Sequence, residues 1–463
     1  MSKDFLILSL YTFFLVGSVT YLVNRFRLYI YFKKIEISNL TIQGYKEFQY
    51  DKKLLLPYIG IFVPARNEGF VIENTIRRLA KMDYPKNRFK VFIIVDEREL
   101  KDKVEVFTKD VVLSVSRELH QTFKTKFISV IEVPEWYSGV FGSHERTYTK
   151  STKGRALNYA LQYINEKKEF NGIELIGILD ADGRLHPKVL KEVGLKKIFN
   201  NAKLLQGPVF QISNFRNVTL VGIAAGLELA IHHMTELPAK ILNNKVQFLA
   251  GTNYFIDKEV ISQVRGWDQD TLVEDAELAL RIYSQLGIKA EWLSCPELEQ
   301  SPENFRIYKK QRERWARGHL CLIKHVLFSN LNNGDKVDFI LKIISSQFRF
   351  IIDFFVPVAA ICFMMSGYFN EIGNAYSYVS FTFLVASLFI LDLYGHVYRR
   401  LVEFMPEKPS VWFQIKISLS LFFFMPFFMF IQAVPRLHAL FNFFSLNQSE
   451  WYKTERTREL IVE

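Results

Sequence analysis

The chain has 463 residues, of which 49% are hydrophobic and 15% are aromatic, and its formal net charge is +11. This length predicts two or three domains rather than one small domain. The basic charge accompanies long apolar stretches, so a lipid bilayer with an anionic surface is a better candidate partner than nucleic acid. The cysteines show no metal-like spacing, which argues against a zinc site and a disulfide framework: they are Cys295, Cys321 and Cys362.

The amino-terminal region, residues 1–34, has the pattern of a transmembrane helix with a basic flank. Phe5–Val23 contains no charged side chain and is about as long as a bilayer core requires. Basic residues follow at Arg25, Arg27, Lys33 and Lys34. The positive-inside rule therefore predicts that the next segment is cytoplasmic. A cleaved signal peptide is the alternative, but its basic region should precede the apolar run.

Residues 54–330 have the alternating pattern of a soluble α/β domain. Tyr58–Val63 is a predicted strand that runs into a loop at Pro64–Gly69. Helical spacing follows over Glu73–Met82, and Val91–Val95 is a second predicted strand. Strands that alternate with helices predict a mostly parallel sheet.

The pattern is less regular after the second strand. Lys101–Arg146 is polar and weakly periodic, so no element is assigned to it. Leu205–Ile212 and Phe248–Ile256 are predicted strands, and Gly251 interrupts the second of them. The apolar segment Val218–Met234 is expected to be interfacial or buried rather than spanning.

Two aspartates follow the strand predicted over Ile173–Leu179. Asp180 and Asp182 would then lie at the carboxyl end of that strand, where open α/β sheets bind their ligands. Two carboxylates beside one loop suit a Mg²⁺ or Mn²⁺ ion that bridges a substrate diphosphate. A turn at the end of the strand is the alternative, because Asp and Gly also favour turns.

Other polar residues are candidates for binding or chemistry. Asp96 follows a predicted strand and can accept hydrogen bonds from a nucleotide. The alternative is a carboxylate that is merely exposed to solvent at the end of the strand. Lys153 precedes a predicted helix and can meet a phosphate as a point charge, with a surface lysine as the alternative. Asp275, next to Glu274, is a candidate general base for an acceptor hydroxyl. A structural role is the alternative for Glu274 and Asp275, because carboxylates in the first turn of a helix interact favourably with the helix macrodipole.

The segment Tyr308–His319 is a predicted helix with one distinctive face. At helical spacing that face holds Gln311, Arg314, Trp315 and Gly318. Arg314 can stabilise a leaving diphosphate, Trp315 can offer its flat face to a sugar, and Gly318 is interpreted as room for a ligand. A basic amphipathic helix on phospholipid headgroups is the alternative, and both interpretations can hold on different faces.

Residues 335–446 are expected to hold an interfacial helix and several membrane helices. The interfacial helix is Lys336–Phe350, and the candidate spans are Phe354–Phe369, Ala375–Leu391 and Ile417–Val434. Three full spans would place the basic tail, residues 447–463, outside, against the positive-inside rule. A bend at Pro426 that re-enters the membrane would keep the tail in the cytoplasm, so its side stays open.

Taken in order, these motifs resemble the membrane-embedded family-2 glycosyltransferases, which include cellulose, chitin-oligosaccharide, hyaluronan and poly-N-acetylglucosamine synthases. The resemblance covers nearly the whole chain. It rests on FVPARNE at Phe62–Glu68, Asp96, KGRALN at Lys153–Asn158, Asp180-Ala181-Asp182, Glu274-Asp275 and QRERW at Gln311–Trp315.

The resemblance implies an α/β GT-A nucleotide-sugar transferase domain with a mixed, mostly parallel sheet, together with transmembrane and interfacial α-helices. It implies a UDP-sugar donor, a Mg²⁺ or Mn²⁺ ion, and an inverting displacement that forms a β-glycosidic link. The protein would be a multi-pass protein of the inner or plasma membrane, with its catalytic domain in the cytoplasm.

The resemblance also implies roles for individual residues. The donor would contact Pro64, Arg66, Glu68, Asp96, Lys153 and Asp180. The metal would bind Asp182, and Asp275 would be the catalytic base with Glu274 beside it. The acceptor and diphosphate site would be lined by Gln311, Arg314 and Trp315. The acceptor would be the growing glycan of a processive polysaccharide synthase or, alternatively, the lipid of a non-processive glycolipid transferase.

Overall fold

The computed structural model describes residues 55–143, 150–243, 245–350, 395–405 and 408–444, and four positions between 23 and 30. A seven-stranded sheet forms one half of the molecule, in the order β3-β2-β1-β4-β8-β6-β9. The strands are β1 (Tyr58–Ala65), β2 (Phe89–Asp96), β3 (Ile128–Val133), β4 (Ile173–Ile178), β6 (Leu204–Gln206), β8 (Tyr254–Asp257) and β9 (Glu291–Trp292). Because only β8 runs antiparallel to its neighbours, the predicted mixed, mostly parallel sheet is confirmed.

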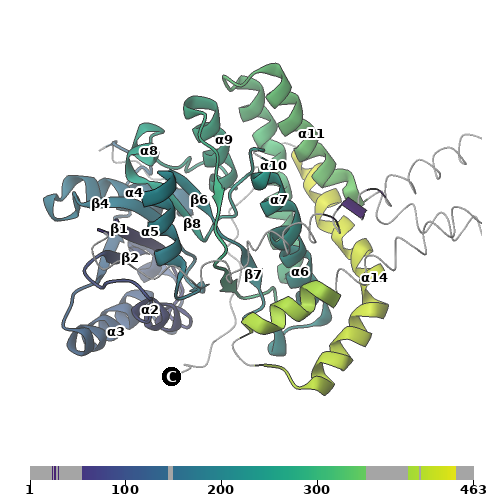
Figure 1. Ribbon diagram of the computed structural model, residues 1–463, viewed down its shortest axis with the longest axis horizontal. Coiled ribbons are helices and arrows are strands. Elements are labelled where there is room, and N and C mark those ends of the chain that lie inside the picture. Colours follow the sequence, from purple (N-terminus) through teal and green to yellow (C-terminus); the bar gives the residue numbers. More distant parts are fainter. Residues whose placement is uncertain are drawn as a thin grey trace, which may run out of the picture.

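Helices cover both faces of this sheet (Figure 1). One face packs on α2 (Ile72–Ala80), α3 (Thr108–Phe123) and α5 (Val189–Asn200), and the other on α4 (Lys153–Glu166), α8 (Lys258–Gln263) and α9 (Glu274–Leu286). Side chains of β1 alternate between the two cores, with Ile61 on one side and Phe62 on the other. Burial on both faces explains why the strands read as continuous apolar runs.

Two predicted strands are only partly correct. Leu205–Ile212 divides into β6 and β7 (Val209–Gln211), and β7 belongs to a small sheet with β5 (Arg184–Leu185) and β10 (Glu297–Glu299). Pro208 lies at the break and has no N–H to contribute to a ladder.

Within the predicted strand Phe248–Ile256, the observed strand β8 begins only at Tyr254. Gly251 (φ 81°) and Asn253 (φ 49°) turn the preceding backbone into the left-handed region. The segment Lys101–Arg146, which carried no assignment, contains α3 and β3.

The other half of the molecule is helical. It contains α6 (Leu220–Ile231), a π-helical turn (His232–Glu236), α7 (Leu237–Leu242), α10 (Phe305–Phe328), α11 (Asn333–Phe350) and α14 (Val411–Phe444). Ala224 and Leu227 of α6 pack with Tyr308 of α10 and Phe428 of α14 in one apolar cluster. The segment expected to be interfacial or buried, Val218–Met234, is therefore largely buried against protein.

The prediction of a multi-pass membrane protein with transmembrane helices, and the membrane localisation that depends on it, is corrected here. Within the part of the chain that the structure describes, every helix is too short or too polar to cross a bilayer. The candidate span Ile417–Val434 lies in α14, where Arg436 pairs with Glu228 of α6 at 3.3 Å. The other candidate spans, Phe5–Val23, Phe354–Phe369 and Ala375–Leu391, lie outside the described residues.

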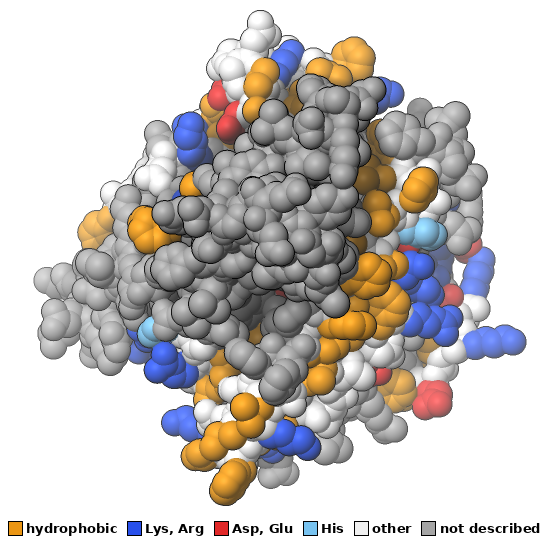
Figure 2. Space-filling view, turned by 90° about the vertical axis from the view of Figure 1, so that its right-hand side faces the viewer, with side chains coloured by type: hydrophobic (Ala, Val, Ile, Leu, Met, Phe, Trp, Pro, Cys, Tyr) orange, Lys and Arg blue, Asp and Glu red, His pale blue; other side chains and the backbone are white. Residues whose placement is uncertain are grey.

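The apolar residues of α14 have two surroundings. Phe428 and Ala439 are buried against protein, whereas Trp412, Phe427 and Phe441 are exposed. Figure 2 shows hydrophobic side chains beside Lys and Arg on the face that carries α11 and α14. An apolar sequence pattern alone does not distinguish these two surroundings.

Candidate active site

A cavity of about 740 Å³ lies between the carboxyl ends of the parallel strands and the helical half. Eleven of the twelve predicted site residues line it: Pro64, Arg66, Glu68, Asp96, Lys153, Asp180, Glu274, Asp275, Gln311, Arg314 and Trp315. The twelfth, Asp182, is buried beside it and accepts a hydrogen bond from the backbone N–H of Gln300 at 3.0 Å. The fold therefore brings the predicted set together, although it was drawn from six separate stretches of sequence.

Asp96 is held in place by hydrogen bonds at the end of β2. Its Oδ1 accepts the backbone N–H of Arg98 at 3.0 Å, and its Oδ2 accepts the Ser151 hydroxyl at 2.6 Å and the Arg155 guanidinium at 2.9 Å. Arg155 is completely buried, and that burial lowers its pKa. Sequence reasoning quoted Arg155 within KGRALN without assigning it a role, although an arginine two residues after Lys153 was a usable signal.

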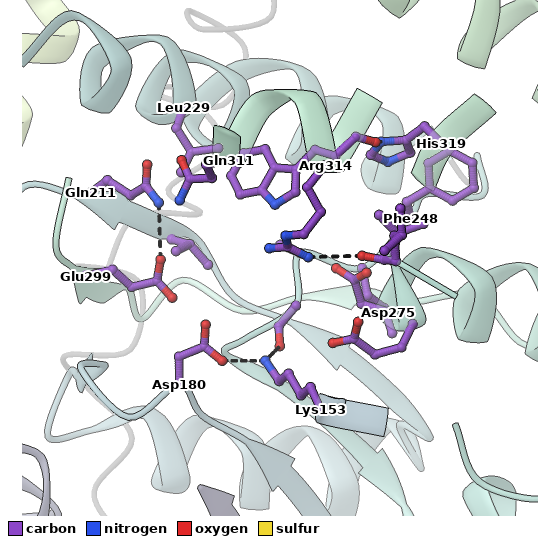
Figure 3. A pocket seen from close by; sticks show the side chains of 18 of the residues that line it. Lys153, Asp180, Gln211, Leu229, Phe248, Asp275, Glu299, Gln311, Arg314 and His319 are labelled. Atoms are coloured by element: carbon purple, nitrogen blue, oxygen red, sulfur yellow. Dashed lines mark hydrogen bonds and ion pairs between the residues drawn. The ribbon is translucent and has the colours of Figure 1, made fainter. Parts of the chain in front are cut away.

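Lys153 forms the floor of the cavity at the first residue of α4 (Figure 3). Its Nζ pairs with the Asp180 carboxylate and donates to the Gly251 carbonyl at 2.8 Å. Burial disfavours the charged ammonium, but the negative charges of Asp180 and Glu274 outweigh burial and raise the pKa of Lys153. The lysine therefore stays protonated in the pH range of enzyme action.

Three carboxylates beside Lys153 form a candidate metal site. One oxygen each from Asp180, Asp182 and Glu299 lies within 4.8 Å of the others. Gln211 approaches Glu299 from the other side, with its amide nitrogen 3.5 Å from Oε2 (Figure 3). Hard oxygen donors of this kind fit Mg²⁺ or Mn²⁺, and these three residues would hold the ion. Sequence reasoning found the two aspartates but missed Glu299, because β10 is distant in sequence and only three residues long.

A fourth carboxylate adds to the negative charge of this cluster. Glu297 is fully buried and accepts hydrogen bonds from the Thr252 hydroxyl at 2.9 and 2.7 Å. Burial raises the pKa of Glu297, and the charge of Glu299 raises it further. A divalent cation in the cluster would reduce this repulsion, which agrees with the donor set.

The acidic pair Glu274-Asp275 begins α9 on the opposite side of Lys153. Burial raises the pKa of Asp275, and burial together with the Asp275 charge raises the pKa of Glu274. Gly251 faces Asp275, and a Cβ at that glycine would come within 3.2 Å of Asp275 Oδ2. A carboxylate with a raised pKa is a stronger base, so this position can accept a proton.

Helix α10 supplies the residues above the carboxylates. Arg314 donates to the Leu272 carbonyl at 3.0 Å and points into the cavity (Figure 3). The Arg312 guanidinium lies over the Trp315 ring at 4.3 Å. The interpretation of Gly318 as room for a ligand is wrong, because a Cβ there would lie 2.5 Å from Val273. The glycine instead lets α10 pack closely on the start of α9.

The end of the cavity beyond Asp275 was not predicted from sequence. The ring centroids of Phe248 and His319 are 5.6 Å apart, and His319 Nδ1 lies 2.8 Å from the Trp315 carbonyl. A carbonyl only accepts, so Nδ1 carries the hydrogen and Nε2 of the neutral ring is an acceptor. Burial lowers the pKa of His319 to about 4, which keeps the ring neutral. Lys342 of α11 completes this end.

The fold and this constellation are those of a glycosyltransferase. The sequence model of the family described as "Glycosyl transferase family group 2" matches residues 175–446, and the chain belongs to this family. The protein is a glycosyltransferase, and the family-2 part of the resemblance is confirmed. These findings do not support membrane embedding or a particular type of polysaccharide synthase.

Among curated proteins, the chain is similar to the probable glycosyltransferase YdaM of Bacillus subtilis, with 24% identity and coverage of 87% of each chain. It is 22% identical to the β-monoglucosyldiacylglycerol synthase of Synechocystis, over 57% of this chain and 48% of that protein. It is 21% identical to the probable glucomannan 4-β-mannosyltransferase 15 of Arabidopsis thaliana, over 60% and 47%.

Among solved structures, the chain is similar to the mannosyltransferase PcManGT from Pyrobaculum calidifontis in complex with GDP-Man and Mn²⁺. The identity is 15%, the TM-score is 0.45, and the match covers 91% of this chain and 98% of that chain.

Proposed function

We propose that the protein transfers a sugar from a UDP-sugar to an acceptor hydroxyl with inversion at the anomeric carbon. The observation that supports this most directly is the placement of one buried base, Asp275, and one carboxylate cluster, Asp180, Asp182 and Glu299, on the same cavity. A divalent ion bound by that cluster would neutralise the diphosphate of the donor.

The residues act together in a single displacement. The acceptor oxygen forms a bond to the anomeric carbon, the bond from that carbon to the diphosphate oxygen breaks, and Asp275 takes the hydroxyl proton. Glu274 lies beside the base, while Arg314 and Lys153 place positive charge near the departing diphosphate. No covalent enzyme intermediate is needed, so one carboxylate base suffices.

We assign the nucleoside to the wall formed by Pro64, Arg66, Glu68 and Asp96. Arg66 is held by Asp102, with Nε 2.9 Å from Oδ2, which fixes the direction of the loop that carries it. The three hydrogen bonds of Asp96 likewise fix the end of β2. A wall ordered before binding reduces the entropy cost of holding the donor.

For the acceptor, we propose a hydroxyl carried by a lipid. The cavity side away from the carboxylates includes apolar residues from four segments: Leu229, Leu237, Phe248, Leu249 and Ile343. Three of the similar curated proteins are named β-monoglucosyldiacylglycerol synthases, which supports a glycolipid product. The second candidate is processive polysaccharide synthesis. It is favoured by Trp315 and Gln311 in the cavity and by the glucomannan mannosyltransferases among the relatives.

Product analysis tests both candidates. The full-length protein is given labelled UDP-glucose, UDP-N-acetylglucosamine or UDP-galactose with Mn²⁺ or Mg²⁺ and dioleoylglycerol in detergent micelles. Asp275→Asn serves as the blank. One sugar per lipid in the organic phase supports the lipid acceptor. Label of high molecular weight that a glycanase digests supports the polysaccharide and overturns the lipid assignment. Equal label in wild type and Asp275→Asn overturns the assigned mechanism.

A further inference from the structure

Lys342 places a positive charge at the acceptor end of the cavity. It lines the cavity from α11, and its Nζ donates to the Val246 carbonyl at 3.1 Å. The same Nζ lies 4.8 Å from the ring centroid of Phe248 and 5.7 Å from that of Phe339. The ammonium therefore lies among a carbonyl and two aromatic faces, and it has three N–H donors to satisfy.

The charged groups around Lys342 compensate its positive charge only in part. In the part of the chain that the structure describes, the ion pairs do not include one to Lys342. Its charged neighbours are Lys240 of α7, Glu236 of the π-helical turn and Asp338 of α11. Glu236 lies 3.2 Å from His232 Nδ1. Burial and the positive charge of Lys240 lower the pKa of Lys342 to about 7, and they outweigh the opposing effect of the Asp338 and Glu236 charges.

A half-buried cation whose charge is only partly compensated is costly, and an anionic ligand reduces that cost. We propose that the acceptor carries a phosphate group, and that this phosphate binds Lys342 and Lys240 while a hydroxyl of the same molecule lies at Asp275. This inference rests on the proposed function, whose acceptor it specifies. The aromatic rings and Ile343 beside Lys342 suit the apolar part of such a molecule.

A purely structural role is the competing explanation. Lys342 contacts Val246 and Phe248 in one segment and lies in α11, so it can simply tie the two together. In that case replacing the lysine would change thermal stability without changing which acceptor the enzyme prefers.

The test uses acceptors with and without a phosphate: the lipid pair differs by a phosphoglycerol headgroup, and the soluble pair differs by the phosphate alone. One pair is dioleoylphosphatidylglycerol and dioleoylglycerol in identical detergent micelles, and the other is sn-glycerol 3-phosphate and glycerol in water. Wild type, Lys342→Met, Lys342→Arg and Lys324→Met are compared with labelled UDP-sugar and Mn²⁺. Lys324 is an exposed residue of α10 outside the cavity lining, so its variant loses the same charge elsewhere.

We expect the wild-type KM to be about tenfold to a hundredfold lower for the phosphate-bearing acceptor, because hydrogen bonds to charged groups are worth that much. Lys342→Met should abolish this ratio, Lys342→Arg should retain most of it, and Lys324→Met should leave it unchanged. Preference confined to the lipid pair identifies a lipid headgroup, and preference in the soluble pair identifies a free phosphate ester. A wild type without preference, or full preference in Lys342→Met, overturns the inference.

A second measurement separates this inference from the proposed function, because it needs no turnover. Inorganic phosphate is titrated calorimetrically into each variant after saturation with UDP and Mn²⁺, so that UDP covers the diphosphate site. A Kd about tenfold weaker in Lys342→Met and unchanged in Lys324→Met supports the phosphate site even if no transfer occurs. The same Kd in all variants, with a lower Tm for Lys342→Met, overturns it in favour of the structural role.

Discussion

The two sides of the cavity hold their charged groups by different means. On the sheet side two charged groups that line the cavity are held by ion pairs within the protein, Asp96 with Arg155 and Asp180 with Lys153. On the helical side, His319 is neutral and Lys342 lies among aromatic rings and a carbonyl. The charged groups of the sheet side are therefore preorganised for a ligand of fixed charge. On the helical side, among the residues that the structure describes, burial, and not an ion pair, surrounds these groups. The positive charge of Lys342 is therefore available to an anionic group of the acceptor.

The largest effect is expected where the two sides meet, at Asp275. Asp275→Asn removes the proton acceptor but keeps the shape, and we expect kcat to fall by about 10²–10⁴. Asp268→Asn, at a residue outside the cavity lining, is the control and should stay close to wild type. Steady-state rates with saturating donor measure this, and an Asp275→Asn rate within a few-fold of wild type would remove Asp275 from the mechanism.

The sheet side should depend on its buried ion pair for stability. Arg155→Met leaves the buried Asp96 carboxylate without its counter-charge, so we expect the free energy of unfolding to fall by about 3–5 kcal/mol. Urea denaturation of wild type, Asp96→Asn, Arg155→Met and the double variant measures the coupling. The double variant should lose less than the sum of the single losses. Additive losses would show that the pair is not the source of the stability.

The carboxylate cluster should control the dependence on metal. Asp182→Asn removes one of three ligands, and we expect it to raise the Mn²⁺ concentration for half-maximal rate by about 10–100-fold. EDTA should abolish wild-type transfer, and added Mn²⁺ should restore it. Glu192→Gln is a matched control, because Glu192 is equally buried but binds Ser294 and Cys295. Unchanged metal dependence in Asp182→Asn would exclude this cluster as the ion site.

The smallest effect is a shift in pH dependence. Burial raises the pKa of Asp275 above its ordinary value of 3.8, and only the deprotonated form can accept a proton. The rate should therefore fall as pH drops through this raised pKa, so the acid limb of kcat should lie above pH 3.8.

At Asp275 the pH dependence of the stability has the opposite sign to that of the rate. The native state holds the Asp275 proton more tightly than the unfolded chain, so ionisation costs free energy and stability declines as pH rises through the native pKa. Asp275→Asn removes that cost, and its Tm at pH 8 should equal or exceed that of wild type. A lower Tm would mean that the ionised carboxylate is stabilised in the fold.

Local sequence patterns were sufficient to predict much of the sheet side of the cavity. Carboxyl ends of parallel strands meet at one edge, so Asp96, Asp180 and the Pro64–Gly69 loop had to converge once their strands were recognised. Helical spacing similarly placed Gln311, Arg314 and Trp315 on one face.

The other features of the site depend on how distant segments pack against one another. Glu299 and Lys342 reach the cavity through packing between segments far apart in sequence, which no local pattern records. The pairing of Arg155 with Asp96 depends on the same kind of packing. The prediction of a membrane span at Ile417–Val434 was wrong for the same reason. Hydrophobicity indicates that a helix must be shielded from water, but it does not indicate whether protein or lipid shields it. In α14, part of that cover is α6 and α10, and only the assembled fold shows it.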